Sequence, residues 1–388
     1  MSTFSYLPEP VAAPDRPEPV PVSAEEVARA VEAVRPASPS GLAGGPARAR
    51  ALFRVADAVE AAGERLAAVQ SRETGRPVRI SLTDVTAVVR TLASFAGWAD
   101  KLEYARTAAA GSGPRTGVVA VLLDAHAPLR TAVDRVAPLL AAGCGVVVSS
   151  AAPLTVLALA ELAEGLPIAV LPGVDPETLA AHPGIDTVER HRPAGSAAVL
   201  VFAAAALDQA VDAIVEGAFC AAGRDAPRLL VQESVADELL VLLGARLTRL
   251  RAGDALDRTT DLPPYPAALR ERVDVLVREA VEDGVRESVW WPGQGSGSRP
   301  TPPVVLVGAA PAMRVVALPE PAPVLPVLTF RTVDEAVSST NPLPGLRTAA
   351  VWTSDTGIAD ATLAGLRAGA LALNARPDEA PTLPRGLL

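Results

Sequence analysis

The chain has 388 residues, 49% hydrophobic and only 3% aromatic, so it is long enough for two domains with cores of small side chains. Its net charge of -9 leaves no basic stripe, which excludes nucleic acid and anionic membrane surfaces as expected partners. The two cysteines lack the spacing of a metal site, and no long apolar segment is present, so we expect no metal, no membrane span and a reduced, cytoplasmic protein.

The first part of the chain predicts an arm followed by helices. Residues 1–22 are Pro-rich and aperiodic, which indicates either an extended arm that binds a partner or a leader without a role. Ser23 followed by Glu in the first turn predicts the start of a helix. A long amphipathic helix is expected from Ala47 to a stop at Gly75, and another over residues 82–105.

Next, continuous apolar runs alternate with helical patterns. The predicted strands are 117–123, 145–150 and 168–173, and the helices between them are 129–142 and 155–164. Strands that are apolar throughout are typical of a parallel sheet covered on both faces. This half is therefore expected to be doubly wound.

The second half continues the alternation and predicts a second α/β domain. Its predicted strands are 198–203, 228–233, 304–308, 324–330, 348–354 and 369–374, with helices over 208–220 and 235–250. The Gly/Ser/Pro run at 293–303 indicates a surface loop. We expect four parts, namely an arm (1–22), a first domain (23–195), a second domain (196–376) and a tail (377–388).

Several stretches, in this order, resemble the aldehyde dehydrogenase superfamily between residues 23 and 374. Among them are RVADAVEAAGERLAAVQSRETGRP, GVVAVLLDAHAPLRTAVDRVAPLLAAGCGVVVSSAAP, RLLVQESVADELL and LRAGALALN. The resemblance implies an aldehyde dehydrogenase-like fold, with a Rossmann-like domain and a second α/β domain. It also implies a chemistry in which a thiolate attacks an aldehyde, hydride passes to NAD or NADP, and a glutamate activates water.

The residue that should be the nucleophile is missing from this resemblance. The family's cysteine follows Asn-x-Gly-Gln-x, and this chain has Ala226 at that place, after the run 221–225. A thioester needs a thiol, so covalent catalysis is not expected. Cys220, upstream on an apolar helix, and Cys144 are expected to be core residues.

The other catalytic positions differ as well. Arg192 stands where the resemblance places the glutamate base, and Glu189 is a displaced alternative. His126 stands where an asparagine amide would hold the oxyanion, and we favour a structural role for it. The charges of Arg224 and Asp225 are expected to lie in a solvated loop.

The dinucleotide site is also expected to be lost. Ser149 and Ser150 replace the lysine that would hold the adenosine ribose, and Glu320 is one residue out of register with the glutamate of the nicotinamide ribose. About 25 residues are missing after Val188, including the helix whose amides hold the pyrophosphate. We therefore assign no catalytic, cofactor-binding or metal-binding residues and expect no cofactor.

Our functional hypothesis is a pseudoenzyme that partners an active aldehyde dehydrogenase as a structural or regulatory subunit. The oligomerisation elements are reduced, because the excursion at 104–116 is short and the chain stops before the family's last strand. Two alternatives stay open. One is a residual NAD(P)-dependent aldehyde oxidoreductase that uses Cys220 and Glu189, and the other is a small-molecule sensor.

Overall fold

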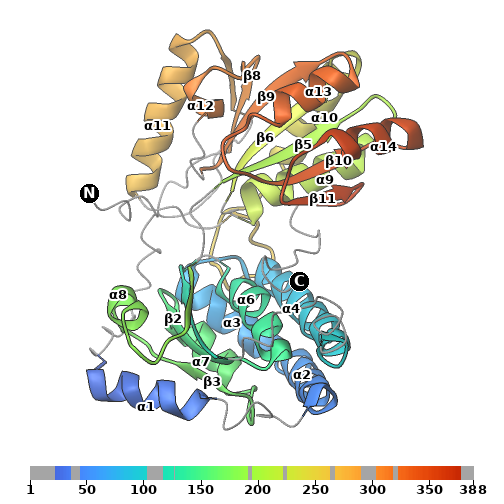
Figure 1. Cartoon of the computed structure of the whole chain (residues 1–388). Coiled ribbons are helices and arrows are strands. Elements are labelled where there is room, and N and C mark those ends of the chain that lie inside the picture. The colour runs from blue at the N-terminus through green and yellow to red at the C-terminus, as the bar shows by residue number, and fades with distance from the viewer. Residues whose placement is uncertain are drawn as a thin grey trace. The chain divides into compact units, whose positions relative to one another are not determined.

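The structure is a computed structural model that contains two compact units (Figure 1). We call the described residues up to 190 the N-terminal unit and those from 195 the C-terminal unit. The predicted excursion at 104–116, the tail, and nearly all of the predicted arm and of the loop at 293–303 lie outside the described residues. These are 22–35, 44–102, 117–125, 127–190, 195–221, 225–262, 267–289, 303–317 and 322–376.

The N-terminal unit is a four-stranded parallel sheet with helices around it. The strand order is β3-β2-β1-β4. The elements are α1 (Ala24–Val34), α2 (Gly44–Ala61), α3 (Gly63–Thr74), α4 (Val78–Ala99), β1 (Val118–Leu123), α6 (Pro128–Ala142), β2 (Gly145–Ser150), α7 (Pro153–Ala160), β3 (Ile168–Val170), α8 (Pro176–Ala180) and β4 (Thr187–Arg190).

Alternating residues of the central strands face two separate cores. Val119, Val121 and Leu123 of β1 belong to a core shared with α2, α3, α4, α6 and α7. Val118 and Ala120 face a smaller core on the other side, shared with α1 and α8. Because the side chains of a strand alternate between its faces, burial on both faces requires the continuous apolar run. The doubly wound arrangement predicted for this half is confirmed.

Local signals place the helix ends. Ser23 and Glu26 form the predicted capping box, and Gly75 ends α3 with a φ of 74°. The single long helix predicted before Gly75 is wrong, because the chain forms α2 and α3 with a break after Ala61. A Cβ on Gly63 would lie 3.3 Å from Val85 Cγ1, so the glycine lets the start of α3 approach α4. The sequence patterns also missed α8 and β4.

The C-terminal unit contains a seven-stranded sheet in the order β11-β10-β5-β6-β9-β8-β7, and only β7 is antiparallel to its neighbour. The elements are β5 (Ser196–Val201), α9 (Leu207–Val215), the π-helix η1 (Glu216–Cys220), β6 (Ala226–Gln232), η2 (Glu233–Val235), α10 (Ala236–Leu247), α11 (Ala267–Glu282), β7 (Arg286–Val289), β8 (Val304–Val307), α12 (Arg314–Ala317), β9 (Val324–Phe330), α13 (Val333–Thr340), β10 (Leu346–Trp352), α14 (Thr356–Gly365) and β11 (Ala370–Leu373).

Helices α11 to α14 share one core with this sheet, while α9 and α10 pack against each other. Phe202 and Phe330, at the ends of β5 and β9, meet edge to face with ring centroids 4.9 Å apart in this core of mostly small side chains. The predicted second α/β domain is confirmed, whereas α11 and β7 were not predicted.

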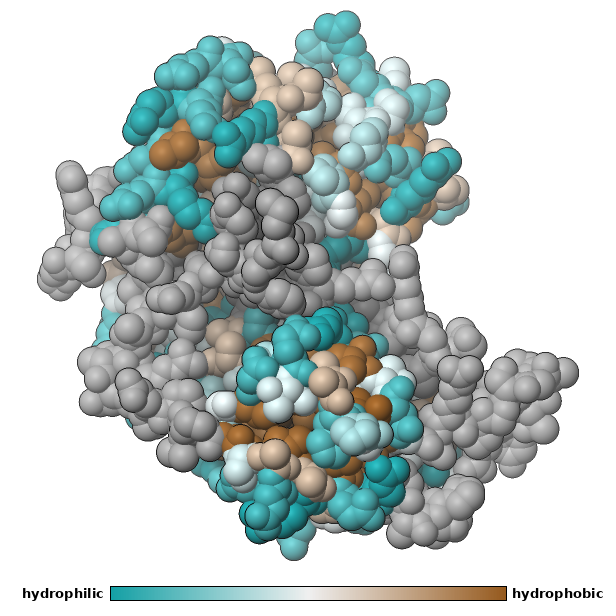
Figure 2. All heavy atoms as spheres, turned by 60° about the vertical axis from the view of Figure 1, so that its left-hand side comes forward, coloured by the Kyte–Doolittle hydropathy of each residue, from teal (hydrophilic) through white to brown (hydrophobic). Residues whose placement is uncertain are grey.

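The described surface is mixed in character. Hydrophilic residues cover most of the described part of the face drawn in Figure 2, with apolar residues between them. No helix within the described residues combines the length and the apolar character that crossing a membrane requires.

Asp134 is an ionisable group on α6 beside α4. Thr91 Oγ1 lies 3.3 Å from its Oδ1, and Arg130 Nε lies 3.7 Å from its Oδ2. Burial raises the pKa of Asp134, helped by the Asp84 carboxylate and opposed by Arg130, Thr91 and Arg135. The folded protein therefore favours the protonated carboxyl.

This predicts a pH-dependent effect of Asp134→Asn. A raised folded-state pKa means that stability is lost as pH rises from the unfolded value through the folded one. The variant cannot titrate there, so its unfolding free energy relative to wild type should increase as pH rises above the ordinary pKa of an aspartate, by about 1.4 kcal/mol for each unit of pKa difference. Urea denaturation across this range tests it. Asp57→Asn, at an exposed position of α2, is the control, and a difference that does not change with pH would contradict the assignment.

Candidate functional site

Ala226, the position predicted to replace the nucleophile, is the first residue of β6. Its N–H donates to Gly195 O at 2.8 Å, its register partner on β5 is Ser196, and it is only 1% exposed. A side chain at this position points into the packed sheet. The position predicted for the nucleophile therefore lies in a paired strand and is shielded from solvent.

Asp225, immediately before Ala226, joins three strands. Its Oδ1 accepts the Gly195 N–H at 3.0 Å, next to the start of β5, and its Oδ2 lies 3.3 Å from Nε of Arg347 on β10. Its side chain is only 18% exposed. The expectation of a solvated loop is therefore wrong for Asp225, while Arg224 and Arg192 lie outside the described residues.

Both thiols of the chain are buried. Cys220 ends η1 and is 0% exposed, and Cys144 is 5% exposed in the larger core of the N-terminal unit. The chain contains two cysteines, so no thiol is available at its surface. Both lie in the core, as expected from their apolar contexts.

Arg228 is a buried cation in β6 that the sequence analysis missed. It is 1% exposed, and its Nε and Nη2 donate to O of Val316, in α12, at 3.0 and 2.9 Å. Burial lowers the pKa of Arg228 to about 10, so the guanidinium stays charged near neutral pH. A charged residue next to the apolar run of β6 was the available signal.

The carboxyl edge of the four-stranded sheet is the second place where chemistry is expected in this fold. Three helices, α6, α7 and α8, begin after β1, β2 and β3, and each has proline as its first residue, which removes one backbone donor. Side chains accept from the amides that follow.

Two of these acceptors come from the C-terminal half of α3. Gln70 Oε1 accepts the Leu129 N–H at 3.0 Å, at the start of α6. The Glu73 carboxylate accepts the N–H groups of Leu154 and Thr155 at 2.9 and 2.8 Å, at the start of α7. Asp175 Oδ2 accepts the Thr178 N–H of α8 at 2.7 Å, and hydrogen bonds from the Thr178 hydroxyl and N–H hold the pKa of this carboxyl below its usual range.

The serines predicted at the adenosine position are also engaged. Ser149 Oγ donates to Val174 O at 3.3 Å, and Ser150 Oγ accepts the Ala152 N–H at 3.0 Å. Both residues are buried, at 5% and 8% exposure. Neither hydroxyl is directed at a ligand position.

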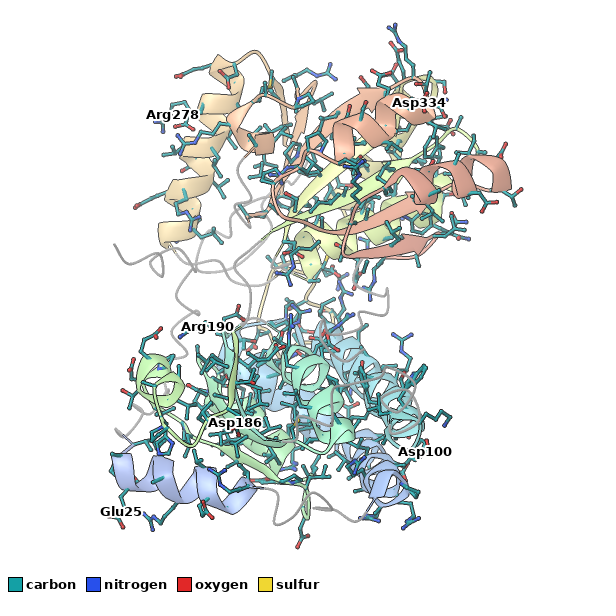
Figure 3. The ribbon with its side chains drawn as sticks, viewed as in Figure 1. Glu25, Asp100, Asp186, Arg190, Arg278 and Asp334 are labelled. Atoms are coloured by element: carbon teal, nitrogen blue, oxygen red, sulfur yellow. The ribbon has the colours of Figure 1, made fainter. Side chains whose placement is uncertain are left out.

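The charges on β4 are paired. Figure 3 labels Asp186 before this strand and Arg190 at its end. Arg190 donates two hydrogen bonds to the Glu177 carboxylate, at 2.8 and 2.9 Å, and this contact raises the pKa of its guanidinium. Glu189, the proposed displaced base, forms an ion pair with Arg135 at 3.4 Å.

Two predicted site residues are not described. His126 and Glu320 lie outside the described residues. Beside the first of them, Ala127 has a left-handed φ of 42°, which is unusual for alanine and marks a tight turn into α6. In the described parts of the chain, no three His, Cys, Asp or Glu side chains gather where they could hold a metal ion.

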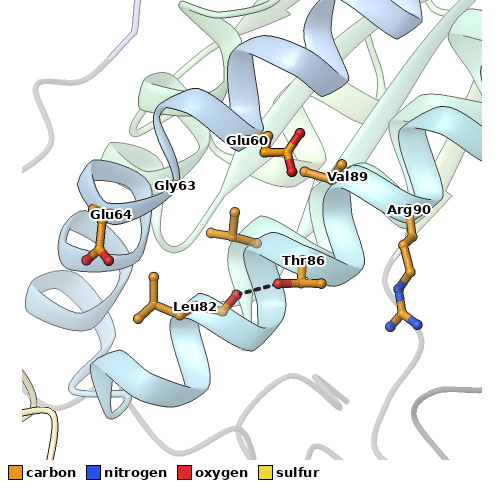
Figure 4. Close-up of a pocket in the computed structure, with 8 residues that line it drawn as sticks. Glu60, Gly63, Glu64, Leu82, Thr86, Val89 and Arg90 are labelled. Carbon is orange, nitrogen blue, oxygen red and sulfur yellow. Dashed lines mark hydrogen bonds between the residues drawn. The ribbon is translucent and has the colours of Figure 1, made fainter.

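A pocket of about 420 Å³ lies between the start of α3 and the middle of α4 (Figure 4). Leu82, Val85 and Val89 form its apolar side, and Thr86 donates its hydroxyl to Leu82 O. The pocket is at the opposite end of α3 from Gln70 and Glu73. It is therefore separate from the carboxyl edge of the sheet.

Comparisons with known proteins give one consistent answer. A statistical model described as the aldehyde dehydrogenase family matches residues 20–189 and 193–386. A dehydrogenase of Acinetobacter baylyi, named for (Z)-2-((N-methylformamido)methylene)-5-hydroxybutyrolactone, is 28% identical over 93% of this chain and 84% of its own. The NADP/NAD-dependent aldehyde dehydrogenase PuuC of Escherichia coli is 29% identical over 88% of this chain and 78% of its own.

Solved structures agree. The NAD-dependent aldehyde dehydrogenase of Sinorhizobium meliloti superimposes with a TM-score of 0.80 at 27% identity, covering 92% of this chain and 80% of that one. The indole-3-acetaldehyde dehydrogenase AldA of P. syringae, solved with NAD+, gives 0.79 at 28% identity, covering 92% and 82%. The expectation of no cofactor is therefore wrong, because similar structures hold NAD and a similar protein is named NADP/NAD-dependent.

The buried position of Ala226 predicts the behaviour of Ala226→Cys. Position 226 is the first residue of β6, and its native side chain is 1% exposed. A thiol there should not react with a thiol reagent in the native protein, and neither should the two native thiols. All should react in denaturant. The extra sulfur is expected to cost about 1–3 kcal/mol of stability. Rapid labelling of the native variant, with wild type unlabelled, would show that this position is open.

The contacts of Asp225 predict a graded loss of stability. Asp225→Ala leaves the Gly195 N–H without this acceptor and should lower the unfolding free energy by about 1–3 kcal/mol. Asp225→Asn keeps an acceptor and loses only the charge, so it should cost about 1 kcal/mol or less. Asp274→Ala, at an exposed position of α11, is the control. Equal losses for the alanine and asparagine variants would contradict the role of the Gly195 contact.

Proposed function

The chain belongs to the aldehyde dehydrogenase family, and we propose that it is a non-catalytic member that binds NAD or NADP and pairs with an active aldehyde dehydrogenase. In this role it stabilises, regulates or positions the active enzyme. The aldehyde chemistry then belongs to the partner.

The observation that carries the proposal is the lack of an accessible thiol. The family's chemistry needs a thiolate, and this chain has only two cysteines, of which Cys220 is 0% exposed and Cys144 is 5% exposed. The place of the nucleophile is taken by Ala226 in a paired strand. The displaced base suggested by the sequence, Glu189, is held by Arg135.

The cofactor part of the proposal rests on the relatives. PuuC is named NADP/NAD-dependent and AldA was solved with NAD+, which supports a dinucleotide as the ligand of this chain. The capped starts of α6, α7 and α8 do not fit a diphosphate, and both serines of β2 are bound to backbone groups, Ser149 to Val174 O and Ser150 to the Ala152 N–H. We therefore assign no described residue to hold that group.

The partner part rests on fold relationship and on the sequence. Related folds pair through related surfaces, so a family member is the expected partner for a chain of this fold. The Pro-rich arm at 1–22 is the segment that we propose to tie the two chains together. The low cysteine content supports a reducing compartment, and we propose the cytoplasm.

The proposal predicts co-purification without turnover. A tagged copy recovered from its native host should bring an active aldehyde dehydrogenase at fixed stoichiometry, measured by native mass spectrometry. The chain purified alone should form no reduced nicotinamide from a panel of aldehydes with NAD or NADP. A chain that always purifies alone would exclude the partner role. Turnover that Cys220→Ala abolishes would instead establish the residual-enzyme alternative.

A further inference from the structure

We infer that the carboxyl edge of the four-stranded sheet does not fit the diphosphate of NAD or NADP, so that phosphate groups add nothing to the affinity of this chain for an adenine nucleotide. This inference rests on the proposed dinucleotide ligand and specifies how it is recognised. It concerns contacts within the N-terminal unit alone.

The starts of α6, α7 and α8 have few N–H groups left to donate to a phosphate. Phosphate groups bind at helix starts because free N–H groups point outward there. At this edge the first residue of each helix is proline, and the following amides donate to Gln70, Glu73 and Asp175. Four of the amides at these helix starts, those of Leu129, Leu154, Thr155 and Thr178, therefore already have acceptors.

The side chains that cap α7 and α8 carry negative charge. Glu73 and Asp175 are carboxylates, and each interacts favourably with the positive end of the helix that it caps. A phosphate approaching α7 or α8 would have to displace a carboxylate or lie beside it, and like charges at such distances repel. Helix starts attract anions in other proteins, but here the partial positive charge of α7 and α8 is already balanced by the protein's own carboxylates.

Two arginines, one at the end of β4 and one on α6, are paired with carboxylates. Arg190, at the end of β4, is held by both oxygens of Glu177, and Arg135 is paired with Glu189. No helix follows β4 in this unit, whose described part ends at Arg190. These guanidinium groups would have to leave a carboxylate before they could bind a phosphate.

The test compares ligands that differ only in phosphate. Calorimetric titration of the full chain at low salt, with NAD, ADP and adenosine, should give dissociation constants for ADP and adenosine within about threefold, and inorganic pyrophosphate should not compete. Added salt should not weaken the binding of ADP, since the protein neutralises no phosphate charge. ADP binding more than about tenfold tighter than adenosine, with competition by pyrophosphate, would overturn the inference but leave the cofactor proposal standing.

Charge-neutral variants give an independent measure. Glu73→Gln and Asp175→Asn each keep an acceptor and remove a charge, so each should tighten ADP about fivefold and leave adenosine unchanged. Asp175 is exposed, so its variant is expected to fold even if Glu73→Gln does not. Glu60→Gln, exposed at the other end of the N-terminal helices, is the matched control. Unchanged ADP affinity in both variants overturns the inference, and no binding of NAD, ADP or adenosine overturns the cofactor proposal together with it.

Discussion

Two side chains three residues apart on α3 hold the N-terminal unit together. Gln70 and Glu73 lie on one face of their helix, and their oxygens reach the first turns of α6 and α7. The Gln70 amide also donates to Ser81 and Asp84 on α4. Both residues are buried, so each of these bonds must be made for the fold to be stable. Four helices are thereby fixed by one polar network.

In the C-terminal unit, too, a few polar side chains near the start of β6 join several elements. Asp225 precedes Ala226 and contacts Gly195, next to the start of β5, and Arg347 of β10. Arg228, two residues after Ala226, donates to Val316 of α12. The polar side chains on either side of Ala226 are therefore engaged in internal contacts. The apolar pattern that builds the sheets does not depend on these contacts, so the fold can tolerate substitutions around Ala226.

Much of the fold was predictable because the signals are local. Continuous apolar runs, the Ser23 capping box and Gly75 each report on a few neighbouring residues. Strand β4 was missed because its Thr, Glu and Arg residues carry no apolar run, and only pairing with β1 makes it a strand. The assignment of Ala226 to the nucleophile position stays a prediction from the sequence. The contacts of Asp225 with Gly195 and Arg347 and the caps from α3 could not be predicted, because they join residues far apart in the chain. No spacing rule reveals such partners.

The strand pairing of Ala226 also bears on the evolutionary history that this chain can follow. An enzyme that loses only its cysteine is one codon away from regaining it. Here the residue is locked in register with Ser196, so recovery would require an insertion that lengthens the connection before β6 as well as a new thiol. Neither change is useful without the other, so selection cannot favour them one at a time. Under the proposed non-catalytic role, backbone length would therefore oppose a return to catalysis, while the surface would remain free to diverge.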